Sequence, residues 1–183
     1  SAIVERERVV LPDDAARQAG IVSGTRIAAA RMLAPTITLL SRDGVQEAAA
    51  MHALACWAGS FTPHVSLAEA TLLLEVGSCL RLFGGIGQIA EAVTRGIGAQ
   101  DFRAYLACAP TPLAAHWLAR CATGALCADV ASMQRQLAAL PVDVLAEHAA
   151  RALDRFGART LGDARRLPAA ELSRRIGAEA VQA

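Results

Sequence analysis

The segment VSLAEATLLLEVGSCLRLFGG, residues 65–85, constrains the fold more than any other part of the sequence. Its apolar runs over 61–69 and 71–76 are separated by so few residues that we expect them to pair as an antiparallel hairpin. Leu72, Leu73 and Leu74 follow one another without a polar residue, which predicts a fully buried strand. This part of the chain is therefore expected to form a sheet that other secondary-structure elements cover.

Helical patterns flank the hairpin and suggest what covers it. An alanine-rich helix is expected over 43–58, a helix over 88–97, a strand over 102–108 and a helix over 109–122. The resulting order β, β, α, β, α is that of an α+β sheet with helices on one face. One strand is missing from the front of that order.

The first 42 residues predict a small unit of their own. A short strand is expected over 8–12 and another over 37–40. Between them, Asp13 is placed to cap a helical turn that Gly20 ends, and a second short helix stops before Pro35.

From Cys121 onward only helical patterns remain, broken by proline and glycine. We therefore predict three domains, 1–42, 43–124 and 125–183. The net charge of +1 gives no global attraction to nucleic acid or to a lipid surface. Residues 151–183 nevertheless carry seven arginines against four acids. Arginines near helix ends suit phosphate contact, and a solvated helical face explains them equally well.

Metal, redox and membrane functions find little support. The five cysteines are odd in number and form no CxxC pair, which favours reduced, buried thiols in a cytoplasmic protein. His52 with Cys56, and His116 with Cys121, do not make a four-ligand zinc set, so no metal site is expected. Neither a signal peptide nor an apolar run of about 18 residues is present, so no membrane partner is expected.

The glycines of LFGGIGQ, residues 82–88, allow a phosphate-loop interpretation because they are expected to follow a strand and open a helix. Their spacing is neither GxGxxG nor a Walker motif, and no lysine follows. A tight strand-to-helix turn explains them at least as well.

Four segments in order carry a resemblance: VVLPDDAARQAGIVSGTRIAAARMLAP, SFTPHVSLAEATLLLEVGSCLRLFGG, YLACAPTPLAAHWLAR and LDRFGARTLGDARRLPAAELSRRIG. Together they resemble the Y-family (DinB/UmuC-like) DNA polymerases of translesion synthesis, most closely the ImuB-type branch. The resemblance implies a partial polymerase core with a fingers remnant, a ferredoxin-like palm sheet lacking its first strand, and a helical thumb of the helix-hairpin-helix kind. It also implies an exposed sheet edge or an apolar groove near the hairpin.

Active members of that family carry Ser-x-Asp-Glu-Ala on the palm hairpin, and this chain has Ala68 at the aspartate position, followed by Glu69. Two-metal phosphoryl transfer needs several converging carboxylates, and an alanine methyl binds no cation. By the same resemblance Arg17 is a relic of the triphosphate site, where Asp14 replaces a tyrosine. Pro112 stands where a triphosphate-binding lysine is expected.

The thumb departs from the family in one place and matches it in another. Its phosphate-clasping Gly-x-Gly hairpin falls on LAEHA, residues 145–149, which lacks both glycines. The later GARTLGD segment, with Thr160 as a helix N-cap, matches better. The candidate DNA-binding residues are Arg159, Thr160, Gly162, Arg165, Arg166, Arg174 and Arg175.

The resemblance implies a non-catalytic, polymerase-like subunit of DNA damage tolerance and SOS-induced mutagenesis that contacts the DNA backbone. Its implied protein partners are the sliding clamp, a RecA-like companion subunit and an error-prone replicative-type polymerase. No cofactor is expected. The alternative is an active translesion polymerase, dependent on Mg²⁺, whose missing strand supplies metal ligands.

Overall fold

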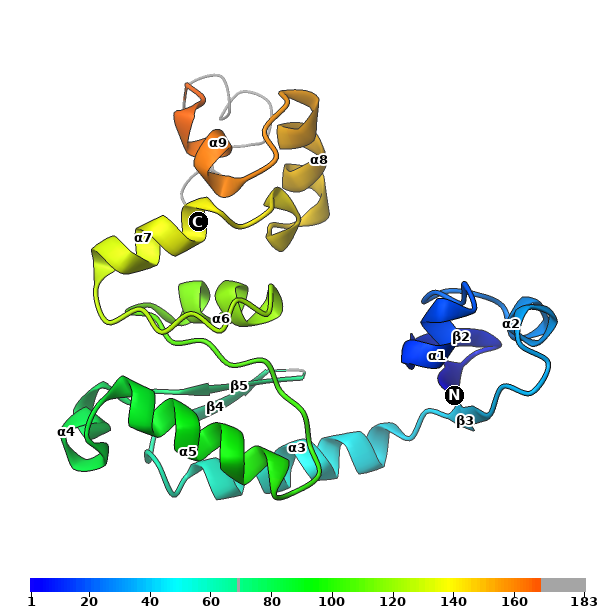
Figure 1. Ribbon diagram of the computed structural model, residues 1–183, viewed down its shortest axis with the longest axis horizontal. Helices are drawn as coiled ribbons and strands as arrows, with labels where there is room; N and C mark the ends of the chain where they lie inside the picture. The colour runs from blue at the N-terminus through cyan, green and yellow to red at the C-terminus, as the bar shows by residue number, and fades with distance from the viewer. Residues whose placement is uncertain (69, 169–183) are drawn as a thin grey trace. The chain divides into compact units, whose positions relative to one another are not determined.

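The computed structural model describes residues 1–68 and 70–168. Its contacts divide the chain into two compact units, Ser1–His52 and Ala53–Ala183, and the division falls inside helix α3 (Gly44–Ala58) (Figure 1). Each unit is described by itself. The three-domain organisation expected from the sequence stays a prediction.

The first unit is built on a small mixed sheet. Strands β1 (Ala2–Glu5) and β2 (Arg8–Pro12) are antiparallel, and β1 pairs in parallel with β3 (Leu39–Ser41) in the order β2-β1-β3. Strands β2 and β3 confirm two sequence predictions, whereas β1 was not expected.

Two short helices complete this unit. Helix α1 (Asp14–Gln18) has the predicted N-cap, because the Asp13 carboxylate accepts a hydrogen bond of 2.8 Å from Ala16 N. Helix α2 (Ile27–Leu33) ends before Pro35, as expected. The buried core of the unit consists of Ala2, Val9, Ala16, Ile21 and Ala30.

The predicted hairpin is present in the second unit. Strand β4 (Val65–Ala68) pairs antiparallel with β5 (Thr71–Leu74), with Ala68 opposite Thr71. The expectation that the β5 leucines are fully buried is wrong, since all four β5 residues are only half-buried. The physical reason is that this sheet has two strands among the described residues, so β5 has a neighbour on one edge only.

Helices α3 and α5 (Ile86–Gly98) pack directly against each other beside the hairpin (Figure 1). A Cβ built on Gly96 would lie 2.2 Å from the Trp57 ring, so only glycine allows this approach. The Trp57 ring also meets Phe61 edge-on, with ring centroids 5.2 Å apart.

The glycine-rich loop connects two helices, not a strand and a helix. A 3-10 turn η1 (Gly77–Cys79) and helix α4 (Leu80–Phe83) precede it. Gly84 ends α4 in the left-handed conformation, with φ of 82°, and Gly85 is the N-cap of α5. The phosphate-loop interpretation therefore loses the strand on which it depended.

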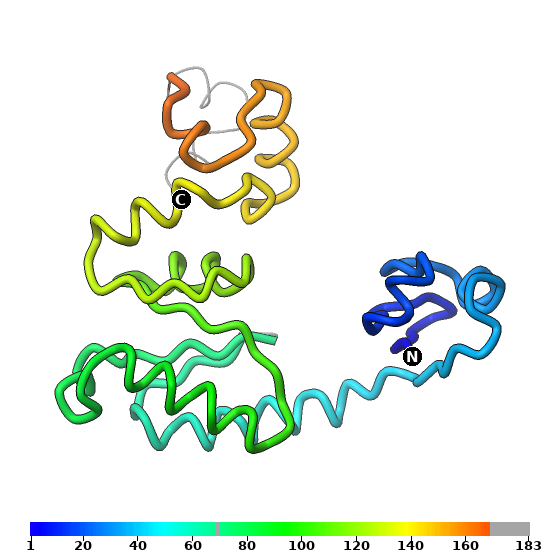
Figure 2. Tube along the Cα trace, viewed as in Figure 1, coloured from blue at the N-terminus to red at the C-terminus, as the bar shows by residue number. Residues whose placement is uncertain are grey.

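The strand expected over 102–108 is not formed. Cys108 makes an isolated parallel bridge with Leu126, and the residues before it pair with no described strand. Figure 2 traces this segment as an extended chain between α5 and α6 (Pro112–Arg120).

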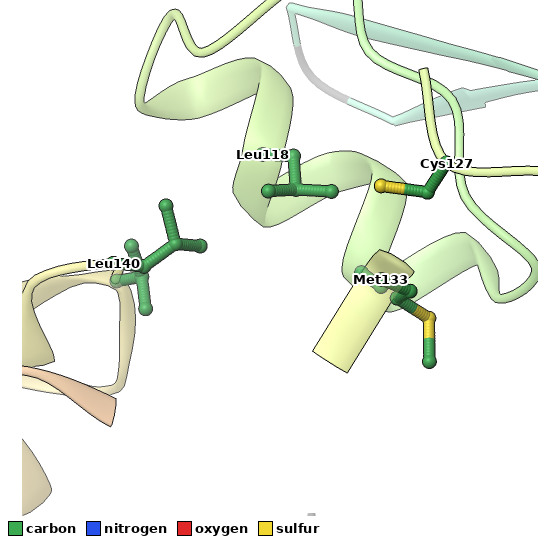
Figure 3. Close-up of a cluster of buried hydrophobic side chains, with 6 residues drawn as sticks. Leu118, Cys127, Met133 and Leu140 are labelled. Atoms are coloured by element: carbon green, nitrogen blue, oxygen red, sulfur yellow. The ribbon is translucent and has the colours of Figure 1, made fainter. Parts of the chain in front are cut away.

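The remaining elements form a helical region, as predicted. They are α7 (Val130–Ala138), the 3-10 turn η2 (Val142–Val144), α8 (Glu147–Arg155) and α9 (Leu161–Arg166). Their core gathers Leu118 of α6, Cys127, Met133 of α7 and Leu140, and Figure 3 shows the Cys127 sulfur pointing toward Leu118. The protein is thus α+β, and the largest cluster of buried side chains among the described residues lies around Leu118.

Candidate functional site

Ala68 ends strand β4 beside the turn of the hairpin, and it is exposed. Its methyl group offers no ligand to a cation, and Ser66, the polar residue of β4, is exposed as well. Glu69 lies outside the described residues. In the part of the chain that the structure describes, no group of three or more His, Cys, Asp or Glu side chains could hold a metal ion. Ala68 and Ser66 supply no carboxylate to a two-metal centre.

Arg17 lies near the end of α1, one helical turn from Asp14. Its Nη1 atom is 2.5 Å from Asp14 Oδ1, which forms an ion pair at spacing i, i+3. Both side chains are more than half exposed, so the pair adds little stability. Its chemical effect is to oppose the guanidinium charge with a carboxylate of the same helix.

Pro112 is the first residue of α6, where the missing N–H has no helical partner to lose. The N-cap is Thr111, whose hydroxyl oxygen accepts a hydrogen bond of 3.3 Å from Ala114 N. The start of α6 is therefore capped, and Pro112 provides neither a positive charge nor a backbone N–H donor there.

The thumb-hairpin position, residues 145–149, covers the end of η2 and the start of α8. An open groove here is lined by charged side chains of both signs: Asp143, Glu147, Arg151, Asp154 and Arg159. Glu147 pairs with Arg151, and Asp154 lies 3.5 Å from Arg159 Nε. With Asp143 the groove has one more acid than arginines, so its net negative charge repels a phosphate group.

The predicted N-cap at Thr160 is confirmed, and it is part of a capping box. The Thr160 hydroxyl accepts from Asp163 N at 3.1 Å, and the Asp163 carboxylate accepts from Thr160 N at 3.1 Å. The hydrogen bond from the Thr160 hydroxyl, followed by those from backbone N–H groups, lowers the pKa of Asp163 below its ordinary value. The backbone N–H groups of Arg159 and Thr160 are thus directed to a carboxylate of the protein.

Gly162 has a packing role. A Cβ at this position would lie 2.8 Å from the Ala138 carbonyl oxygen, so α9 approaches α7 here only because residue 162 is glycine. This close contact gives Gly162 a packing role, and its predicted contact with DNA stays a prediction.

The candidate arginines of α9 and its approach remain at the surface. Arg159 and Arg166 are exposed and lie 3.5 Å and 3.7 Å from Asp154 and Asp163. Arg165 is exposed, with no ion pair to a described residue. Arg174 and Arg175 lie outside the described residues. Of the candidates, Gly162, Arg165 and Arg166 thus lie in α9, and Arg159 and Thr160 are the two residues directly before it.

Sequence reasoning named Asp14 but missed its ion pair with Arg17, and it missed Asp163 as a member of the capping box. Both were visible as spacings: Asp14 with Arg17, and Thr160 with Asp163, are i, i+3 pairs at helix starts. The expectation of buried thiols was also largely wrong, because only Cys127 is buried and Cys56 is exposed. No helix among the described residues has the length and apolarity to cross a membrane.

Comparison with solved structures defines the class of the fold. The chain superposes on a Dbh ternary complex with a TM-score of 0.81 at 19% identity, covering 99% of this chain and 56% of that one. It superposes on DinB from Sulfolobus solfataricus with a TM-score of 0.78 at 17% identity, again covering 99% and 56%. The fold is that of a Y-family polymerase core, as expected from the sequence.

Residues 2–120 match the impB/mucB/samB family, and the chain belongs to this family. It is also similar to Protein ImuB from two strains of Caulobacter vibrioides, each 29% identical over 165 residues. That similarity covers 88% of this chain and 36% of the relative. The chain therefore spans about a third of the length of the curated relatives it matches and just over half of the solved structures.

Proposed function

We propose that this chain is part of a non-catalytic, polymerase-like subunit that acts in DNA damage tolerance and induced mutagenesis in bacteria. The observation that carries the proposal is Ala68, which stands where active members of the family have a metal-binding aspartate. The similarity to Protein ImuB supports the same assignment.

The other two altered positions weaken nucleotide binding independently of the metal. Asp14 opposes the charge of Arg17 at 2.5 Å, and Pro112 supplies neither charge nor donor at the start of α6. The altered residues lie on three separate elements, β4, α1 and α6, and each of them weakens the binding of metal or nucleotide. One compensating ligand elsewhere would not restore all three functions.

Direct metal binding tests the proposal. The full-length protein, with DNA and a nucleoside triphosphate present, is titrated with Mn²⁺ and followed by electron paramagnetic resonance. We expect no stoichiometric site, because Ala68 removes a ligand that two-metal chemistry needs. Two Mn²⁺ ions bound per chain, with a loss of both on Glu69→Ala, would favour the active polymerase instead.

DNA contact is proposed to be directed to the backbone and carried by exposed arginine side chains rather than by helix amides. Arg165 has no acid beside it among the described residues, whereas the start of α9 is occupied by Asp163. Replacing Arg165 and Arg166 by Gln should reduce the slope of log K against log salt by roughly two on duplex DNA. The matched control is Arg26 and Arg31 of the first unit, which should change it little.

By the resemblance, the protein partners are the sliding clamp, a RecA-like companion subunit and an error-prone replicative-type polymerase in the cytoplasm. The proposed role of the polymerase-like fold is then to hold DNA and proteins together. Pull-down of the full-length protein with each purified partner tests this part separately from catalysis.

A further inference from the structure

The parallel bridge between Cys108 and Leu126 has two faces with different surroundings. Cys108 N donates to Ala125 O, and Cys127 N donates to Cys108 O, each at 2.8 Å. Side chains alternate between the two faces of an extended chain. Cys127 points into the core around Leu118, as Figure 3 shows, so Leu126 lies on the opposite face, where it is 40% exposed.

The opposite face borders an open groove of about 390 Å³. Leu106 and Leu126 line it from the side of the bridge, and Ala90 and Glu91 line it from α5. Tyr105, which is 75% exposed, lines it as well. Most of the lining residues are apolar or small. A groove of this kind that opens to water can bury apolar side chains of another molecule.

The backbone of Leu126 offers hydrogen bonds at the outer edge of the bridge. Residues 125 and 127 supply both bonds to Cys108, so the N–H and C=O of Leu126 point away from it. Neither group forms a backbone hydrogen bond to a described residue. Gly124 and Ala128, on either side, are exposed. Such an edge can pair with an extended segment of another chain.

Glu91 gives the groove its charge. It is the one charged side chain among the described residues that line the groove, and it is exposed. It forms no ion pair with a described residue. A carboxylate without a partner, next to apolar side chains, attracts lysine or arginine and repels acidic residues.

We propose that the edge at Leu126 binds an extended segment of a partner protein. The segment pairs with the N–H and C=O of Leu126 and adds a strand beside residues 125–127. Its side chains on one face alternate apolar and basic residues, so that the apolar ones enter the groove and the basic one lies next to Glu91. Backbone pairing supplies affinity, and the groove with Glu91 supplies specificity.

A pair of labelled peptides tests the proposal on the full-length protein. The first has the sequence Thr-Val-Thr-Arg-Thr-Val-Thr, and the second has glutamate in place of arginine. Fluorescence anisotropy should show about fivefold tighter binding of the arginine peptide, because one charge next to Glu91 is exchanged for its opposite. Failure of both peptides to bind, or equal binding of both, would overturn the proposal.

Three variants locate the binding. Glu91→Arg should reverse the preference, so that the glutamate peptide binds more tightly. Asp101→Asn is the matched control, since Asp101 is an exposed acid close after α5 that does not line the groove, and it should change nothing. Leu126→Pro removes the outward N–H and neither bond to Cys108, and it should weaken binding about fivefold. A preference that survives Glu91→Arg would overturn the proposal even if Leu126→Pro fails to fold.

Amide hydrogen exchange separates strand addition from simple contact with the groove. The amide of Leu126 should exchange at least about tenfold more slowly with the arginine peptide bound. Binding that leaves this amide unchanged would overturn the added strand. Self-association of the protein without peptide, lost in Leu126→Pro, would overturn the proposal in favour of a second copy of the chain. None of these readouts involves DNA or catalysis, so their failure leaves the proposed function standing.

Discussion

The β4–β5 hairpin and the helical region from α6 to α9 lie in one unit but are stabilised differently. The hairpin has a mostly exposed strand β4 that includes Leu67, a half-buried strand β5 and an open edge. The helical region has a buried core around Leu118 and capping boxes at both α7 and α9. The hairpin, where catalysis would occur, is thus less buried than the helical part, which has a buried core and capped helices of its own. This difference suits a chain that kept the polymerase fold as a support.

The largest difference between the two regions is expected when one leucine in each is truncated to alanine. Leu118 is fully buried, so Leu118→Ala should reduce the free energy of unfolding by about 2–5 kcal/mol. Leu67 is 46% exposed, and Leu67→Ala should cost about 1 kcal/mol or less. Chemical denaturation of the full-length protein measures both, and equal losses would remove the contrast between the two regions.

A smaller effect is expected at Gly162, where α9 meets α7. Gly162→Ala places a methyl group 2.8 Å from the Ala138 carbonyl oxygen and should destabilise by about 1–3 kcal/mol. The control is Gly98→Ala at the end of α5, where no atom lies within 4 Å of the new methyl group. Gly98→Ala should be neutral or slightly stabilising. If Gly162→Ala is tolerated as well as the control, the close helix approach is wrong.

The capping box of α9 should contribute less, and its contribution should depend on pH. Thr160→Ala should cost about 1 kcal/mol at pH 7. The pKa of Asp163 is lowered from 3.8 by the hydrogen bond from Thr160, so this stabilisation is complete above that value and is lost as pH falls through the lower, folded-state pKa. The difference between wild type and Thr160→Ala should therefore shrink below about pH 4. A difference that is constant from pH 7 to pH 2 would contradict the capping box.

The sequence predicted the elements that local rules determine. The hairpin, the caps at Asp13 and Thr160 and the break after α2 follow from short-range spacing and turn chemistry. The strand over 102–108 failed because strand formation needs a partner, and none is among the described residues. The role of Gly162 could not be read from GARTLGD, because the carbonyl that it meets lies 24 positions earlier in the chain.

The smallest predicted effect concerns Arg17, the residue that the resemblance assigns to a former triphosphate site. Asp14→Asn removes the carboxylate beside Arg17 and should strengthen nucleoside triphosphate binding by at most about fivefold, because the exposed pair is weak. Isothermal titration of the full-length protein measures this, and Arg17→Gln in the same background is the control that should cancel the gain. An increase that survives Arg17→Gln would assign the binding to another site.

Primer extension by the full-length protein tests the central claim most directly. Rigorously purified protein is given Mg²⁺, a primer-template and all four nucleotides, alone and as the Ala68→Asp variant. We predict no incorporation by either form, because Asp14 and Pro112 still weaken triphosphate binding when the aspartate is restored. Incorporation by the unmodified protein that Glu69→Ala abolishes would show that the chain belongs to an active polymerase and would contradict the account.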